Sequence, residues 1–172
     1  MKAIASTLLV TSLVGQAAAL ELSSPDINDG QSMAKAHVSS CCGGDDVAPA
    51  FTWRDEPAGT KSFALTMIDV TARPPLGWTH WIVVGIPATV HSIPSGGALS
   101  DGARAVAGSG GAGAYFGPCP PEGTGVHQYV FTLYALPEPA PAVMPKADPR
   151  EISAQMSAAA TAKATLTGTW QR

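Results

Sequence analysis

The segment 61–86, KSFALTMIDVTARPPLGWTHWIVVGI, contains two hydrophobic runs, 61–69 and 78–86, joined by a short segment with two prolines. Both runs are apolar at successive positions instead of alternating, which is typical of strands that are buried on both faces. A third run, 127–136 (HQYVFTLYAL), has the same character and ends before Pro137. We expect these three strands to form the centre of a sheet that is covered on both sides.

The sequence around these runs predicts short strands and turns. The chain has 18 glycines and 15 prolines, and only 13% of its residues are charged, which favours a compact, turn-rich β domain. We expect an edge strand within 20–30, a short strand at 51–53 and a final strand at 166–171. The Gly/Ser/Ala-rich segment 95–113 has no clear period and predicts a long loop.

One helix is expected near the C-terminus. Asp148 can cap it, Pro149 suits its first turn, and Glu151 stands at the capping-box position. Ile152 and Met156 begin an apolar stripe, and the helix is expected to continue to about residue 164. The predicted fold is therefore mostly β, a two-sheet antiparallel β-sandwich with a C-terminal α-helix.

The N-terminal segment has the pattern of a secretory signal. Lys2 precedes an apolar run, 3–14, and Ala17 and Ala19 suit signal peptidase. The alternative, an amphipathic N-terminal helix, is disfavoured because this segment has no charged face. We expect cleavage near Ala19, a periplasmic or secreted protein, and one domain over 20–172 without stable membrane insertion.

The net charge limits the kinds of binding partner that the sequence favours, and the cysteines bear on the redox state of its cellular compartment. The formal net charge is −3 and no Lys/Arg cluster exists, so no nucleic-acid partner is expected. In an oxidising compartment, Cys41 or Cys42 can bridge to Cys119, with Cys42–Cys119 as the candidate pair. Three buried thiols are the alternative, and the cysteine spacing does not indicate a zinc site.

The ends of the three strands carry the candidate functional residues. Asp69 ends the first run, Trp78 and His80 begin the second, and His127 and Tyr129 begin the third. If these ends are neighbours, two imidazoles, a phenol and a carboxylate form an anion pocket, in which the carboxylate can raise an imidazole pKa.

These residues could also have a structural role in the core instead of a role in binding. Period-2 spacing predicts that Trp78, His80, Ile82 and Val84 share one face. A histidine in a hydrophobic strand is about as often a core residue with a satisfied hydrogen bond as a ligand. The two remaining histidines, at 37 and 91, have no partners nearby in the sequence and are expected at the surface.

Catalysis has less support than binding. The chain has no Gly-x-Ser-x-Gly, no His-Glu-x-x-His and no phosphate-loop Lys-Ser/Thr. Asp69, His80 and His127 could together hold a metal, but nothing in their spacing demands it. We expect that the protein is not an enzyme and that it needs no cofactor or metal. A hydrolase that uses His80 or His127 as its base is a third hypothesis, after a binding protein and a protein-interaction module.

Two groups of motifs resemble the signatures of the phosphatidylethanolamine-binding protein family. The first comprises residues 57–67, Asp69 and the stretch 77–83 (GWTHWIV); the second comprises 117–121 (GPCPP) with Gly123 and 127–136. Residues 42–44 (CGG) and Trp53 resemble the opening of the bacterial, Raf-kinase-inhibitor-like branch. The resemblance extends in order over nearly all of 20–172.

The resemblance implies a two-sheet β fold with a pocket for phosphate-like anions, including phospholipid head groups. The matching positions are Asp69, Trp78, His80, Pro121, His127 and Tyr129. The leading hypothesis is therefore a secreted or periplasmic binding protein for a small anion or phospholipid head group. The alternative is a protein-interaction module that inhibits a protease or another partner.

The chain departs from the family pattern near the pocket. Thr71 stands where the family usually has a second Asp, and Arg73 where it has Pro. Gln128 replaces an Arg, and Ala158-Ala159 replaces a Gly-His pair in the helix. These changes make the expected rim less acidic and add a cation.

Overall fold

The computed structural model describes residues 19–73, 75, 77–139 and 148–172. Nearly all of the predicted signal segment and most of the proline-rich connector after Pro137 lie outside the described residues. The strands are β1 (Glu21–Ser23), β2 (Gln31–Ser32), β3 (Phe51–Arg54), β4 (Ser62–Asp69), β5 (Trp78–Pro87), β6 (Ser92–Ile93), β7 (Arg104–Val106), β8 (His127–Leu136) and β9 (Ala162–Trp170). The helices are the 3₁₀ turns η1 (Lys35–His37) and η2 (Ser40–Cys42) and the α-helix α1 (Pro149–Ala159).

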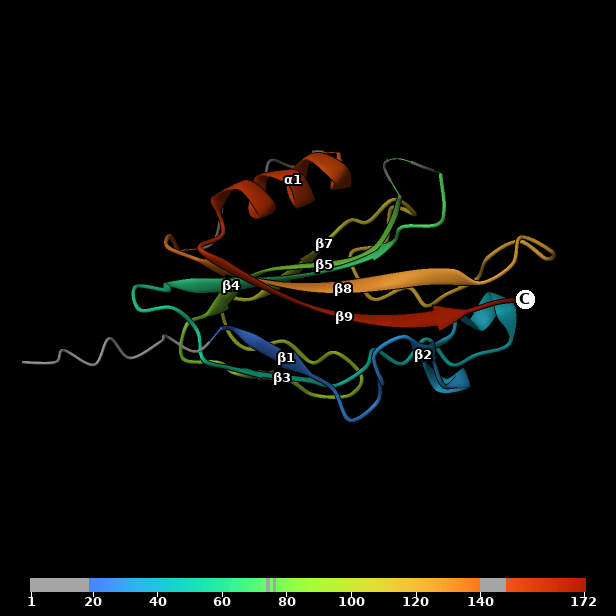
Figure 1. Cartoon of the computed structure of the whole chain (residues 1–172), viewed down its shortest axis with the longest axis horizontal. Coiled ribbons are helices and arrows are strands. Elements are labelled where there is room, and N and C mark those ends of the chain that lie inside the picture. The colour runs from blue at the N-terminus through green and yellow to red at the C-terminus, as the bar shows by residue number, and fades with distance from the viewer. Residues whose placement is uncertain (1–18, 74, 76, 140–147) are drawn as a thin grey trace, which may run out of the picture.

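The strands form two sheets that pack face to face. The larger sheet has the order β2-β9-β8-β4-β5-β7 and the smaller one the order β1-β3-β6. All pairs are antiparallel except β2 with β9. The small sheet covers one face of the large sheet and α1 covers the other (Figure 1). The predicted two-sheet sandwich with a C-terminal helix is therefore confirmed.

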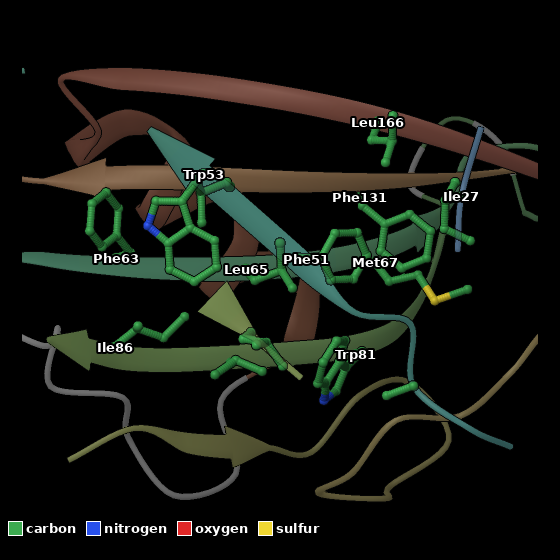
Figure 2. Close-up of a cluster of buried hydrophobic side chains, with 14 of the residues drawn as sticks. Ile27, Phe51, Trp53, Phe63, Leu65, Met67, Trp81, Ile86, Phe131 and Leu166 are labelled. Atoms are coloured by element: carbon green, nitrogen blue, oxygen red, sulfur yellow. The ribbon is translucent and has the colours of Figure 1, made fainter. Parts of the chain in front are cut away.

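The main core lies between the two sheets. Figure 2 shows Phe51 and Trp53 of β3 lying over side chains of the large sheet. The rings of Phe51 and Phe131 are 4.9 Å apart, and those of Trp53 and Phe63 are 5.5 Å apart. Full burial of a large apolar side chain stabilises a fold by about 1.5–3 kcal/mol. These aromatic contacts therefore join the sheets.

A second apolar cluster lies on the opposite face of the large sheet. Ile152 and Met156, the predicted stripe of α1, pack with Ala64, Ile82 and Tyr134. The central strands are therefore buried on both faces, which explains why 61–69 and 78–86 lack hydrophobic alternation.

The C-terminal elements differ from the prediction in their bounds. Asp148 does cap α1, accepting a hydrogen bond from the backbone N–H of Arg150. However, α1 ends at Ala159 instead of about residue 164, and β9 begins at Ala162 instead of 166. The reason is that β9 pairs with β8 along its length, and these tertiary hydrogen bonds outweigh the helix propensity of the alanines.

Two other predicted segments also differ. The segment 95–113 is not entirely a loop, because β7 within it pairs with residues 82–84 of β5. The expected edge strand within 20–30 is only three residues long. Ser24 ends it, since its hydroxyl accepts hydrogen bonds from the backbone N–H groups of Asp26 and Ile27.

Candidate ligand-binding site

A cavity of about 530 Å³ opens at one end of the large sheet. Antiparallel pairing places Asp69, at the end of β4, opposite Trp78 at the start of β5 and Tyr129 near the start of β8. The structure thus brings the predicted strand ends together. All six residues predicted from the sequence line the cavity: Asp69, Trp78, His80, Pro121, His127 and Tyr129. Their role in binding a ligand stays a prediction.

Asp69 and His127 form a buried pair at the base of this site. The Asp69 Oδ2 atom lies 2.6 Å from His127 Nδ1, and both side chains are less than a tenth exposed. Asp69 Oδ1 accepts hydrogen bonds from the backbone N–H groups of Thr71 and Ala72, at 2.9 and 3.0 Å. Asp69 therefore fixes both the imidazole orientation and the loop that follows β4.

The second ring nitrogen of His127 faces Thr124. His127 Nε2 lies 2.9 Å from Thr124 Oγ1, whose hydroxyl donates to the carbonyl of Pro121 at 2.7 Å. A hydroxyl has one proton, so when Thr124 donates to Pro121 it can only accept from Nε2–H. Both ring nitrogens of His127 therefore have hydrogen-bond partners, Asp69 at Nδ1 and Thr124 at Nε2.

His80 enters the cavity through a β-bulge. Ile68 pairs with Thr79 and Met67 with Trp81, so His80 has no partner across the pair. The prediction that Trp78, His80, Ile82 and Val84 share a face is therefore wrong. Beyond the bulge, Ile82 and Val84 point toward α1, whereas the His80 ring packs edge-on against Tyr129 at 5.2 Å.

The environment of His80 favours its neutral form. Its Nδ1 lies 2.8 Å from the carbonyl oxygen of Phe116, so Nδ1–H donates there. Burial lowers the pKa of His80 below its ordinary value, and the Phe116 carbonyl and the Asp69 carboxylate offset this only in part. The Asp69 carboxylate thus raises the pKa of His80, as expected from the sequence, but burial outweighs this effect and the net shift is downward.

Tyr129 supplies a buried hydroxyl that makes no hydrogen bond of normal length and angle within the described part of the chain, although the Asp69 carboxylate lies near it. The side chain is fully buried, and its hydroxyl has no hydrogen-bond partner among the described residues. Burial, the negative charge of Asp69 and the pull of that carboxylate on the phenol proton raise the pKa of Tyr129 far above its ordinary value, so the phenol keeps its proton. An unpartnered buried donor in a cavity wall is costly unless a ligand or water accepts from it.

Two of the departures from the family pattern, Thr71 and Arg73, line the cavity. The guanidinium of Arg73 stacks on the Trp78 ring, 4.6 Å from its centroid. Thr71 Oγ1 accepts a hydrogen bond from the backbone N–H of Gln128 at 3.0 Å. Thr71 therefore ties the β4 end to β8, and Arg73 provides a cation beside the opening.

The opposite wall is held by the predicted disulfide. Cys42 bonds to Cys119, and Cys41 is an exposed free thiol. Asp46 accepts hydrogen bonds from the backbone N–H groups of Ser40 and Gly117, at 2.7 and 2.9 Å. Burial alone would raise the pKa of Asp46, but these hydrogen bonds outweigh it and hold the pKa below its ordinary value.

The two remaining histidines differ from each other. His37 was expected at the surface, which is wrong: it is 5% exposed, and its Nδ1 lies 2.8 Å from the Val47 carbonyl oxygen. Its partner is ten residues away, so the local sequence gave no sign of this burial. His91 is exposed, as predicted, and lies beside Glu56.

Metal-ligating side chains converge at one place within the described part of the chain. The sulfur atoms of Cys41, Cys42 and Cys119 lie within 4.8 Å of one another. The disulfide uses two of them, so the oxidised cluster offers one thiol. Asp69, His80 and His127 do not form such a group with converging ligand atoms.

The described helices are short or polar. None of them combines the length and the hydrophobicity that a bilayer-spanning helix needs.

Comparison with known proteins gives consistent matches. The family model for phosphatidylethanolamine-binding proteins matches residues 23–171. Escherichia coli YbcL is 38% identical over 142 residues, which cover 77% of each chain, and E. coli YbhB is 39% identical over 124 residues, 68% of this chain and 78% of YbhB. LppC of Mycobacterium tuberculosis, whose name refers to a lipoprotein, is 39% identical over 97% of this chain and 80% of its own. The crystal structure of YbcL superimposes with a TM-score of 0.83 at 32% identity, over 90% of this chain and 99% of YbcL.

Proposed function

The chain belongs to the phosphatidylethanolamine-binding protein family, and from this premise we propose that its cavity binds a small phosphate-like anion, free or as a phospholipid head group. The observation that carries the proposal is the unpartnered hydroxyl of Tyr129, a proton donor buried in the cavity wall. An anionic oxygen would satisfy this donor, and a charge-assisted hydrogen bond of this kind is about twice as strong as a neutral one.

The charges around the cavity support an anion more than a cation. The carboxylate of Asp69 is already compensated by His127 and by two backbone N–H groups. Arg73, exposed at the mouth, adds a positive charge with no acidic partner among the described residues. The remaining walls include the rings of Trp78 and Phe116, which can pack against the apolar part of a ligand.

We propose an extracytoplasmic location for this activity. The N-terminal sequence has the signal pattern described above, and the Cys42–Cys119 disulfide persists in oxidising compartments. The name of the related LppC, which refers to a lipoprotein, is consistent with this location.

A calorimetric titration of the purified, oxidised protein with phosphate and with phosphoethanolamine tests the proposal. Tyr129→Phe removes only the hydroxyl and is expected to weaken binding about tenfold or more, as the loss of one buried hydrogen bond to a charged group implies. His91→Gln is the matched control, because His91 is exposed and does not line the cavity. Absence of saturable binding, or equal affinity in Tyr129→Phe, contradicts the proposal.

The same titration has an expected pH dependence. Protonation of His80 adds a positive charge to the cavity, and burial places its pKa below 6.5. Phosphate and phosphoethanolamine themselves gain a proton at about pH 6–7, so the pH series uses sulfate, whose charge stays constant. The affinity for sulfate should rise as the pH falls through the lowered pKa of His80, and this effect should be absent in His80→Gln. Comparison of phosphate with phosphoethanolamine separates recognition of the phosphate from recognition of a head group.

Hydrolysis is a second candidate that one observation favours. Thr124, His127 and Asp69 form a chain of contacts, 2.9 and 2.6 Å long, that has the order of a nucleophile, a base and an orienting carboxylate. We favour binding because the Thr124 proton points to the Pro121 carbonyl instead of His127. Turnover of p-nitrophenyl acetate that is lost in both Thr124→Val and Asp69→Asn would reverse this preference.

A further inference from the structure

Three cysteine sulfur atoms gather at the mouth of the cavity. Cys42 and Cys119 form the disulfide, and the free Sγ of Cys41 lies 3.0 Å from Sγ of Cys119. Cys41 and Cys119 both line the cavity, whereas Cys42 does not. An exposed thiol thus touches one sulfur of a disulfide beside the proposed binding site.

We propose that this cluster is a thiol–disulfide exchange site, in which the bridge alternates between Cys42–Cys119 and Cys41–Cys119. The Cys41 thiolate attacks Sγ of Cys119 and forms the new S–S bond. The bond between Cys119 and Cys42 breaks, and Cys42 leaves as a thiolate that takes up the proton lost from Cys41. One S–S bond forms and one breaks, so the protein keeps one disulfide and one thiol, and no external oxidant or reductant is needed.

The local fold permits both bridges. Cys41 and Cys42 are adjacent residues of the single turn η2, and they face one partner on the segment that follows β7. Asp46 holds the two segments together independently of the disulfide, through its bonds to Ser40 and Gly117. Neither segment is therefore released while the bridge moves.

The two bridges also close loops of nearly equal length. Cys42 and Cys119 are separated by 77 residues, and Cys41 and Cys119 by 78. Because loop-closure entropy depends only on the logarithm of loop length, the chain itself favours neither isomer. Contacts of the sulfur atoms decide the balance, and one of them is Ser39 Oγ, 3.1 Å from the Cys41 sulfur.

Exchange would change the chemistry of the cavity mouth. With the Cys42–Cys119 bridge, the lining contains a free thiol at Cys41. With the Cys41–Cys119 bridge, that thiol is consumed and the free thiol moves to Cys42, outside the lining. Cys41 is therefore the position at which thiol reagents and low-molecular-weight disulfides would modify the site, and the isomer present determines whether they can.

Mapping of the free thiol tests the exchange. The oxidised protein is equilibrated at pH 8, acidified to stop exchange, labelled with N-ethylmaleimide, then reduced and labelled with iodoacetamide. Fragment spectra distinguish the two adjacent cysteines. We expect maleimide on both Cys41 and Cys42. When the equilibration is repeated at lower pH, labelling of Cys42 should appear more slowly, because the thiolate is the nucleophile. Maleimide on Cys41 alone at every time and pH overturns the proposal.

Two variants test whether each bridge can form. Cys41→Ser is expected to keep Cys42–Cys119 and to bind no maleimide. Cys42→Ser is expected to form Cys41–Cys119 and likewise to bind none, whereas two reactive thiols after oxidation would overturn the proposal. These measurements use the ligand-free protein, so a failure of anion binding leaves their outcome unaffected.

Discussion

Replacement of Asp69 by Asn tests whether the pair with His127 supports the fold as the structure implies. The change keeps the side-chain shape, and its oxygen can still accept from the backbone N–H groups of Thr71 and Ala72. It replaces one buried charge-assisted hydrogen bond, worth about 1.5–3 kcal/mol, by a neutral one worth about 0.5–1.5 kcal/mol. The free energy of unfolding should therefore fall by about 1–2 kcal/mol.

Asp69→Ala should cost more, because it removes the acceptor of three hydrogen bonds and leaves His127 buried without its partner. Loss of one partner from a buried pair costs about 3–5 kcal/mol. Urea unfolding followed by tryptophan fluorescence, with the disulfide intact, measures both variants.

A double-mutant cycle isolates the contact. Asp69→Asn and His127→Gln, singly and together, should show a coupling free energy of at least about 1 kcal/mol, since the two side chains touch. A coupling near zero, or an Ala variant as stable as the Asn variant, would refute the assigned role of this pair.

The remaining predictions concern the disulfide wall and His80. Cys119→Ser should lower the free energy of unfolding by about 4.5 kcal/mol on the chain-entropy model, whereas Cys42→Ser should lower it much less if the neighbouring cysteine re-forms the bridge; urea unfolding of both compares them. Gly117→Ala places a Cβ 2.5 Å from two backbone atoms and should cost about 1–3 kcal/mol, while Gly110→Ala, which meets only a ring carbon at 3.9 Å, should stay within about 0.5 kcal/mol in thermal unfolding. Burial lowers the pKa of His80, so the unfolded chain binds a proton at this residue more readily than the folded chain does. The contribution of His80 to the free energy of unfolding is therefore fully present above pH 6.5 and is lost as the pH falls through the lowered pKa. A pH series of unfolding curves should show a flatter decline in His80→Gln.

The sequence predicted the parts of the fold that carry their own local pattern. The runs 61–69, 78–86 and 127–136 are β4, β5 and β8 within one residue at each end, because long apolar runs bounded by turn residues have few other stable arrangements. The start of α1 was predictable in the same way, since Asp148 and Pro149 are local cap residues. The six candidate site residues could be named because they stand at the ends of these runs or in the matching family motif.

Elements at the sheet edges were less predictable. Strand β7 has only three residues, and β9 begins in an alanine-rich segment that favours helix by itself. Both exist because a neighbouring strand offers backbone hydrogen-bond partners. That information lies in residues 82–84 and 127–135, far from the segments concerned, so local propensity predicted a loop and a longer helix.

The sequence by itself thus determined the central strands, the sandwich class, the family resemblance and the residue types available for the site. Only the tertiary structure decided how those residues act. The β-bulge turns His80 into the cavity and its neighbours Ile82 and Val84 away from it. The carbonyl that holds His80 comes from Phe116, 36 residues later, and the carboxylate that holds His127 is 58 residues earlier. Burial and hydrogen bonding set protonation and orientation, and both depend on contacts between segments that are distant along the chain.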